Sequence, residues 1–134
     1  MRYLLDTHIL FWSLSDEEKI PKDILTVIND PNNDIYFSTA SVWEVIIKHA
    51  KNPGGMPVGG QEFVEGCLTA GFANLPICNH HVLAIGSLVR KAGEPRHNDP
   101  FDRILIAQAK IEEMKFITHD SLLGGYGEAC VISI

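Results

Sequence analysis

Short apolar runs limit the folds open to this chain more than any other feature of its sequence. Four runs, at residues 3–5, 35–37, 115–119 and 131–134, are largely apolar instead of alternating with polar residues. Such runs are typical of strands that are buried on both faces. Because segments with helical spacing separate them, we predict an α/β fold, a three-layer α/β/α sandwich around a central parallel sheet.

The segments between the strands predict helices, loops and one edge strand. Apolar spacing predicts helices over residues 7–14, from Pro21, over 42–48, around 63–68, over 79–91 and from Pro100. Residues 73–78 are predicted as an edge strand, because Pro76 cannot donate a ladder hydrogen bond. Loops are expected at residues 29–34, 52–60 and 93–98, and a flexible loop around Gly124, Gly125 and Gly127.

Length and cysteine content indicate the class of protein. A chain of 134 residues predicts a single domain, residues 1–134, with one sizeable core. Cys67, Cys78 and Cys130 lack a metal-binding spacing and are expected to be buried thiols in a reducing cytoplasm. No apolar run approaches the roughly 18 residues of a membrane span, and Asp6 interrupts any signal-peptide core, so no membrane association is expected.

The charge balance excludes one class of nucleic-acid-binding protein. Seventeen acidic residues against eleven basic ones give a formal net charge of −6. This argues against a basic protein that coats nucleic acid. A nuclease remains compatible with the composition if its surplus acids are gathered at a metal site.

The sequence around Asp99 predicts the start of a helix. Asp99 is a good N-cap, and Pro100 suits the first helical position, where its missing N–H costs nothing. Asp102 is then the third helical residue and shares a face with Ile106 and Ala109. That apolar face should carry the carboxylate inward. Asp102 either satisfies free N–H groups at the helix start or meets other acids around a metal.

Three further acids are predicted at the same edge of the sheet. Asp6 and Asp120 each follow a strand, and Glu44, like Asp102, is expected in the first turn of a helix. The carboxyl ends of parallel strands and the following helix N-termini lie along one edge, where open α/β folds bind ligands. The spacing therefore allows the four carboxylates to converge.

Each of these acids also has a local interpretation. Asp6 can cap the helix from Thr7, and Asp120 can cap a turn that begins at Ser121. The spacing of Ser41 and Glu44 is a capping-box pattern, and Glu44 can pair with a lysine four residues later. Acids at all four positions suggest a shared site without deciding the question, since Ser, Thr and Asn cap helices equally well.

Convergence would require a cation. Two carboxylates 4 Å apart repel by about 4 kcal/mol at an effective dielectric constant of 20. Ligand sets made only of oxygen favour Mg²⁺ or Mn²⁺ over zinc or copper. Such ions activate water and neutralise the charge that develops on a phosphodiester, which is the chemistry of a hydrolytic nuclease.

The chain resembles PIN-domain ribonucleases of the VapC-type toxin branch over nearly its whole length. The segments that carry the resemblance are 4–8, 41–48, 99–109 and 117–120, of which 99–109 is the most specific. The resemblance implies an endoribonuclease dependent on Mg²⁺ or Mn²⁺, a homodimer, and an antitoxin protein that binds and inhibits it. His119 and the Gly- and Pro-rich segment 52–60 depart from the usual pattern.

The resemblance also implies roles for individual residues. Asp6, Glu44 and Asp102 would be metal ligands, and Asp120 would complete the site directly or through water. Asp99 fits the motif but lies beside the ligand set, so it is expected to support the site without binding the metal.

Several other residues have competing interpretations. Thr7 can hydrogen-bond a ligand carboxylate or cap its helix, and Arg103, together with Arg96, can grip RNA phosphate or form structural ion pairs. His80 and His81 are adjacent and expected to point apart, which disfavours zinc. Trp12 and Trp43 are expected to be packing residues.

Two other functions stay open at this point. An aspartate-dependent phosphohydrolase would use Asp6 as nucleophile, but its usual second acid two residues later is replaced by His8. A PIN-like module that only binds RNA or protein is the other alternative. Intact acids at all four positions argue against it, and metal-dependent cleavage of RNA would separate the three.

Overall fold

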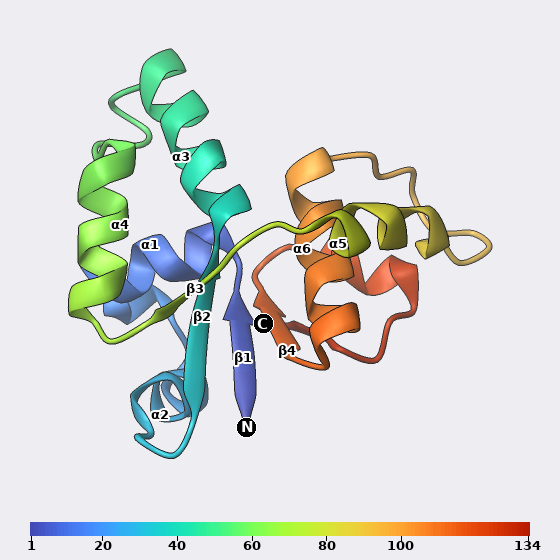
Figure 1. The fold of residues 1–134 in the computed structure, drawn as a ribbon, viewed down its shortest axis with the longest axis horizontal. Helices are drawn as coiled ribbons and strands as arrows, with labels where there is room; N and C mark the ends of the chain where they lie inside the picture. Colours follow the sequence, from blue (N-terminus) through green and yellow to red (C-terminus); the bar gives the residue numbers. More distant parts are fainter.

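Five parallel strands form the central sheet of the computed structural model, which describes residues 1–134 (Figure 1). The strands are β1 (Arg2–Leu5), β2 (Asp34–Ser38), β3 (Ala73–Leu75), β4 (Lys115–Thr118) and β5 (Val131–Ser133). Their order is β3-β2-β1-β4-β5, and every neighbouring pair is parallel. The strand order therefore reverses at β1, and ligands bind at such a point in open α/β sheets.

Helices cover both faces of the sheet. They are α1 (Thr7–Ser15), α2 (Lys22–Asn29), α3 (Thr39–Lys51), α4 (Gly60–Thr69), α5 (Asn79–Ala84) and α6 (Pro100–Glu112). Three 3₁₀ helices, Glu17–Lys19, Ile85–Ser87 and Ser121–Tyr126, complete the regular structure. Figure 1 shows α1 and α4 on one side of the sheet and α5 and α6 on the other.

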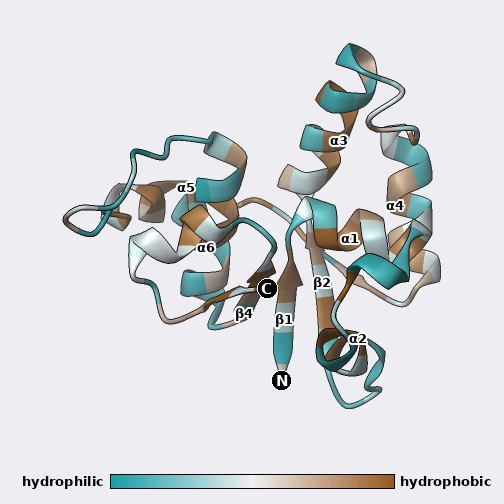
Figure 2. Ribbon diagram, turned by 180° about the vertical axis from the view of Figure 1, so that it is seen from behind, coloured by the Kyte–Doolittle hydropathy of each residue, from teal (hydrophilic) through white to brown (hydrophobic).

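The core is divided by the sheet into two layers. Leu5 packs with residues of α1, α2 and α4, whereas its neighbour Leu4 packs with residues of α6. Successive residues of a strand point to opposite faces, so a strand buried on both sides has no polar positions. Figure 2 shows the resulting hydrophobic stretches of β1 and β4 at the centre of the molecule. The predicted three-layer α/β/α sandwich is confirmed.

The predicted helix over residues 79–91 is wrong in its length. The α-helix ends at Ala84 and continues as the 3₁₀ helix Ile85–Ser87. Val82 and Val89 are 50% and 70% exposed, and His81 is buried instead. Gly86 lies in the 3₁₀ turn, and a glycine costs about 1 kcal/mol relative to alanine inside an α-helix.

The glycines near the carboxyl end do not form a flexible loop. They belong to, or directly follow, the 3₁₀ helix Ser121–Tyr126. A Cβ at Gly125 would lie 2.6 Å from the Arg90 guanidinium, so a larger residue would require that side chain to move. Arg90 Nη1 in turn donates to the carbonyl of Leu122, 2.6 Å away. Close approach of a side chain, and not mobility, accounts for this glycine.

Other expectations are confirmed in part. β3 lies at the edge of the sheet and ends at Leu75, just before Pro76. Cys67 is buried as expected, but Cys78 is exposed and Cys130 is only partly buried. None of the helices is both long and apolar enough to span a bilayer.

Candidate functional site

A polar cleft of about 360 Å³ opens at the carboxyl ends of β1 and β4, where the strand order reverses. None of its eight lining residues is hydrophobic. They are Asp6, His8, Glu44, Lys48, Asp99, Asp102, His119 and Asp120. A larger hollow of about 580 Å³ lies beside the loop between α2 and β2, but six of its fourteen lining residues are hydrophobic. The concentration of titratable groups singles out the smaller cleft.

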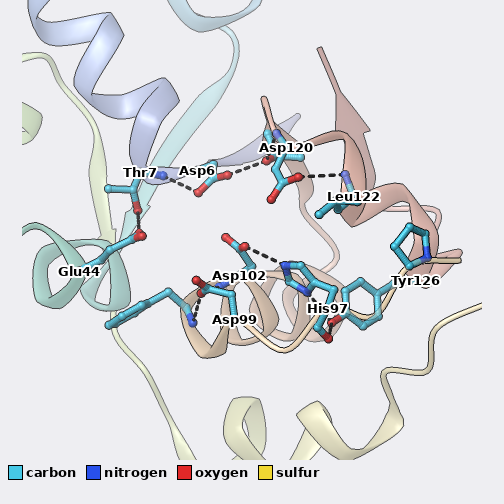
Figure 3. A network of polar contacts seen from close by, with 12 residues as sticks. Asp6, Thr7, Glu44, His97, Asp99, Asp102, Asp120, Leu122 and Tyr126 are labelled. Carbon is cyan, nitrogen blue, oxygen red and sulfur yellow. Dashed lines mark hydrogen bonds and ion pairs between the residues drawn. The ribbon is translucent and has the colours of Figure 1, made fainter. Parts of the chain in front are cut away.

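Asp6 is both a helix cap and part of the cleft. Its Oδ1 accepts from the backbone N–H of Thr7 at 2.7 Å, and its Oδ2 accepts from the hydroxyl of Thr118 at 2.6 Å (Figure 3). The residue is 6% exposed. Burial raises the pKa of this carboxyl, and the nearby Glu44 charge adds to the rise, while both hydrogen bonds oppose it. The predicted capping role is confirmed, and it coexists with a place in the cleft.

Glu44 reaches the cleft from the second turn of α3, not from the first. The helix is capped by Ser38, whose hydroxyl accepts from the N–H of Ala40 at 3.0 Å. The expected capping box of Ser41 and Glu44 is therefore wrong. β2 ends at Ser38 and α3 begins at the next residue, so the helix starts three residues earlier than the serine at position 41 suggested.

Both carboxylate oxygens of Glu44 have protein partners. Oε1 accepts from the hydroxyl of Thr7 at 2.5 Å, so the predicted contact of Thr7 with a candidate ligand carboxylate is confirmed. Oε2 pairs with Lys48 at 2.9 Å, which confirms the ion pair expected from their spacing. Glu44 is nearly as buried as Asp6, at 7% exposure. Hydroxyl and ammonium donors thus hold this side of the cleft in place.

Asp99 and Asp102 enter the cleft from the start of α6. Asp99 is the N-cap, as predicted, and its Oδ1 accepts from the N–H groups of Phe101 and Asp102 at 2.9 and 3.1 Å. Asp102 is the third helical residue, and its Oδ2 lies 3.0 Å from His97 Nε2. Burial, then the charges of Asp6, Asp99, Glu44 and Asp120, raises the pKa of Asp102 to about 8. The acids therefore act on one another electrostatically.

Asp120 closes the cleft from the far side of β4. That strand ends at Thr118, so His119 separates it from the acid. Asp120 Oδ1 accepts from the N–H of Leu122 at 2.9 Å and caps the following 3₁₀ helix, as the local interpretation predicted. Figure 3 shows its carboxylate facing those of Asp6 and Asp102.

The donor chemistry of the cleft suits a hard divalent cation. Asp6, Glu44, Asp102 and Asp120 come from four different elements and supply only oxygen atoms. Lys48 is the sole lysine or arginine among the lining residues. Without a cation, such a group keeps at least one proton, and the raised pKa of Asp102 expresses this. Carboxylates select Mg²⁺ or Mn²⁺, so the residues present fit such an ion.

Some functional neighbours were not predicted from the sequence. His97 and Thr118 hydrogen-bond Asp102 and Asp6, and His8 and His119 line the cleft. His97 carries no local signal, because its position depends on how the loop before α6 folds back. Thr118 lies one residue inside the predicted strand, where alternation across the sheet alone does not indicate a contact with Asp6.

Arg103 does not line the cleft. Its Nη2 donates to the carbonyl of Ile85 at 3.4 Å, which favours the structural role over the RNA-binding one. His80 and His81 do not point apart, since their ring centroids are 4.2 Å apart and both approach Glu112.

The tryptophans differ from each other. Trp43 is 60% exposed, so its prediction as a packing residue is wrong, and its ring meets that of Phe101 edge-on at 5.2 Å. Trp12 is partly buried and contacts the His8 and His119 rings, with centroids 5.9 and 4.9 Å away.

The sequence profile of the family described as PIN domain matches residues 3–126. The chain belongs to the PIN-domain family. The matched segment contains all the acids of the cleft and ends at Tyr126, whose hydroxyl contacts His97. No curated protein matches the sequence at a significant level.

Solved structures share the fold of this PIN domain at low sequence identity. VapBC2 from Rickettsia felis, bound to a DNA fragment from its promoter, has a TM-score of 0.69 and 16% identity, covering 100% of this chain and 98% of that chain. DNA-bound VapBC from Salmonella typhimurium has a TM-score of 0.66 and 15% identity, covering 99% and 98%. A toxin–antitoxin complex from Klebsiella pneumoniae has a TM-score of 0.63 and 21% identity, covering 98% and 96%. At these identities the likeness concerns the fold.

Proposed function

We propose that this PIN domain is a metal-dependent endoribonuclease that hydrolyses RNA phosphodiester bonds. The observation that carries the proposal is the convergence of Asp6, Glu44, Asp102 and Asp120 in one cleft at the reversal point of the sheet. These four residues would hold Mg²⁺ or Mn²⁺. When bound, such an ion lowers the pKa of a water ligand and neutralises charge on the phosphodiester.

The chain's own residues prepare the site before any substrate arrives. The hydroxyl groups of Thr7 and Thr118 donate hydrogen bonds to Glu44 and Asp6, which fixes one oxygen of each carboxylate. Both carboxylates are nearly buried, so their orientation needs little reorganisation on binding. Asp99 stabilises the first turn of α6 and thereby positions Asp102.

The remaining residues of the cleft offer contacts to RNA. Lys48 is 41% exposed, and its ammonium group beside Glu44 is suited to a phosphate of the substrate. His8 and His119 are exposed at the rim and present N–H donors and ring faces. These groups would orient a flexible single strand, which fits an open cleft better than a rigid duplex does.

We also propose that the protein is the toxin of a toxin–antitoxin pair, acts in the cytoplasm as a homodimer, and is inhibited by its antitoxin. Support comes from the solved structures of the same fold, which include VapBC complexes and a toxin–antitoxin complex. Co-expression with any small protein that is encoded beside it tests this. Relief of growth arrest and a stable complex are expected, and no interaction would contradict it.

Cleavage of single-stranded RNA by the purified protein tests the nuclease proposal. We expect products with Mg²⁺ or Mn²⁺ and none in excess EDTA. Full activity in EDTA would contradict the metal mechanism. Binding of RNA without cleavage under any metal would favour the non-catalytic module. The phosphohydrolase alternative is disfavoured because its usual second acid, two residues after Asp6, is replaced by His8.

A further inference from the structure

A second, basic pocket adjoins the acidic cleft. It has a volume of about 200 Å³ and lies at the carboxyl end of α3, where the Gly- and Pro-rich segment 52–60 begins. Its lining residues are His8, Lys48, Lys51, Asn52, Gly55 and Met56. None of them is acidic, and two of them, His8 and Lys48, also line the cleft. The charge of the surface therefore changes sign between two adjoining hollows.

The turn after α3 builds the floor of this basic pocket. Asn52 ends the helix, and its carbonyl accepts from the N–H groups of Gly55 and Met56 at 3.1 and 3.0 Å. Met56 is 3% exposed and belongs to the hydrophobic core, and its own carbonyl oxygen lies 2.7 Å from Nδ1 of His49. The segment that departs from the usual PIN-domain pattern thus begins with a turn that is anchored to the core.

Gly55 allows this turn to close against the side chain of Asn52. A Cβ at Gly55 would lie only 2.6 Å from Asn52 Nδ2, so the amide would have to move. Asn52 Oδ1 accepts from the N–H of Gly55 at 3.2 Å, which orients the amide, and Nδ2 has no acceptor in the protein. Both N–H groups of Nδ2 therefore remain available to a ligand.

The positive charge of the basic pocket is only partly neutralised. Lys51 is exposed and forms no ion pair, whereas Lys48 pairs with Glu44 at 2.9 Å on the side of the cleft. Lysines in the last turn of a helix also complement its dipole. That role explains the two lysines but not the amide of Asn52, which is held beside them without an acceptor.

The donors of the basic pocket are those that bind nucleic-acid phosphates, namely ammonium and amide N–H groups. Its volume is below the range of about 300–1,000 Å³ that is typical of drug-sized ligands, so it suits a single phosphate group. We propose that Lys48, Lys51 and Asn52 bind the RNA phosphate that neighbours the cleaved one. This inference rests on the proposed function and deepens it, because phosphate contacts position a strand without reading its bases.

Binding of a fluorescein-labelled oligouridylate in EDTA tests the proposal without any cleavage. We expect Lys51→Gln to weaken binding about three- to fivefold, measured by fluorescence anisotropy, and to reduce the steepness of its salt dependence by about 0.7 per decade. Lys22→Gln is the matched control, because it removes the same charge from an exposed lysine of α2, near the amino ends of the strands (Figure 1). An equal loss in both variants, or no measurable binding by the wild type at low salt, would overturn the proposal.

Two glycine variants test the pocket without changing its charge. Gly55→Ala displaces the amide of Asn52 and should weaken binding about threefold, with the salt dependence unchanged. Gly54→Ala should bind like wild type, because its Cβ would lie at an ordinary 3.5 Å from Asn52 Oδ1. Asn52→Ala removes the amide and should lose at least as much affinity as Gly55→Ala. It also replaces Gly55→Ala if that variant does not fold, as judged by circular dichroism, and unchanged binding by Asn52→Ala would overturn the proposal.

Competition with polyglutamate distinguishes an RNA phosphate from an acidic segment of a protein. Polyglutamate should displace the labelled strand only at far higher concentration than unlabelled oligouridylate does. Equal potency of the two competitors would overturn the proposal in favour of a protein ligand.

These measurements separate the basic pocket from the nuclease proposal. Weaker binding by Lys51→Gln and Asn52→Ala, in a protein that cleaves no RNA with any metal, would contradict the nuclease proposal and leave the pocket standing. RNA cleavage with Mg²⁺ or Mn²⁺, with the binding of both variants unchanged, would do the reverse.

Discussion

The two walls of the cleft hold their carboxylates in different ways. On one wall, Asp6 and Glu44 receive hydrogen bonds from two threonine hydroxyls, a backbone N–H and Lys48. On the other wall, Oδ2 of Asp102 meets only the ring of His97. Both oxygens of Asp6 and of Glu44 thus have a partner, whereas Oδ1 of Asp102 has none. Burial, together with the charges of Asp6, Asp99, Glu44 and Asp120, raises the pKa of Asp102 to about 8.

The comparison suggests that the two walls respond differently when an ion or a substrate binds. A wall whose donors are already in place costs little reorganisation when an ion or a substrate arrives. A wall that holds a proton exchanges it on binding, so metal affinity at that wall depends on pH. Substitutions on the two walls should therefore have different consequences for stability and for the response to metal.

Removing a candidate ligand from either wall should have the largest effect. We expect Asp6→Asn and Asp102→Asn each to lower kcat/KM for RNA cleavage by more than about 100-fold, while the fold survives. Asp99→Asn should cost less than about tenfold, because asparagine is also a good N-cap. Cleavage assays on the three purified variants make the comparison. Equal inactivity of Asp99→Asn and Asp102→Asn would show that our choice between these two acids is wrong.

Removing a hydroxyl from the satisfied wall should destabilise the protein. Thr7→Val has nearly the same shape but leaves Oε1 of buried Glu44 without its donor. The expected loss in the free energy of unfolding is about 1–3 kcal/mol, measured by urea denaturation. Thr26→Val is the control, because its hydroxyl is exposed and contacts only the carbonyl of Lys22 in the same helix. If Thr7→Val lowers the free energy of unfolding no more than Thr26→Val does, the hydroxyl does not stabilise Glu44 and the two walls do not differ in this way.

Removing the charge from the unsatisfied wall should stabilise the metal-free protein. The pKa of Asp102 rises from 3.8 to about 8 on folding, so the folded state binds more protons between these pH values. Stability therefore falls as the pH rises from about 4 to about 8 and levels off above that. Asp102→Asn removes the contribution of Asp102 to this slope, and its melting temperature in EDTA at pH 7 should be about 3–6 °C higher than wild type.

Mg²⁺ should reverse the order of the melting temperatures of wild type and Asp102→Asn. Mg²⁺ binds the folded site, so it should stabilise wild type more than Asp102→Asn. Thermal melts of both proteins, in EDTA and in Mg²⁺, give the four melting temperatures to be compared. A mutant that melts below wild type in EDTA, with equal shifts by Mg²⁺, would mean that Asp102 only complements the helix dipole.

The smallest effect is expected for the partly exposed ion pair. Lys48 contacts Glu44 from four residues away on α3 and is 41% exposed. Such pairs contribute about 0.3–0.5 kcal/mol, so Lys48→Gln should change the free energy of unfolding by less than about 0.5 kcal/mol. An increase in KM for RNA without a change in stability would assign the ammonium group to the substrate.

The sequence predicted the elements whose signals are local. The start of α6 is an example, since Asp99 and Pro100 define the cap and the first turn by themselves. The strands were predicted because their central residues are buried on both faces and therefore apolar, as at Leu4–Leu5 and Phe116–Ile117. The same rules failed at α3, where Ser38 and Ser41 are equally good caps and only the end of β2 decides between them.

The rest of the site depends on tertiary contacts that no local pattern records. His97 meets Asp102 because Tyr126, 29 residues later, holds its ring in place. Gly125 looked like a source of flexibility, although it makes room for the guanidinium of Arg90. In both cases the partner is far away in the chain, and periodicity within a segment does not identify it.

The position of β1 at the centre of the sheet has a consequence for biosynthesis. Its two neighbouring strands, β2 and β4, come from distant parts of the chain: Tyr3 pairs with Ile35 on one side and with Lys115 on the other. During translation, one edge of this first strand stays open until β4 has left the ribosome. Asp120 and Tyr126 emerge later still, so every shorter nascent chain lacks a complete cleft. If the cleft cleaves RNA as proposed, the chain therefore stays inactive for most of its synthesis.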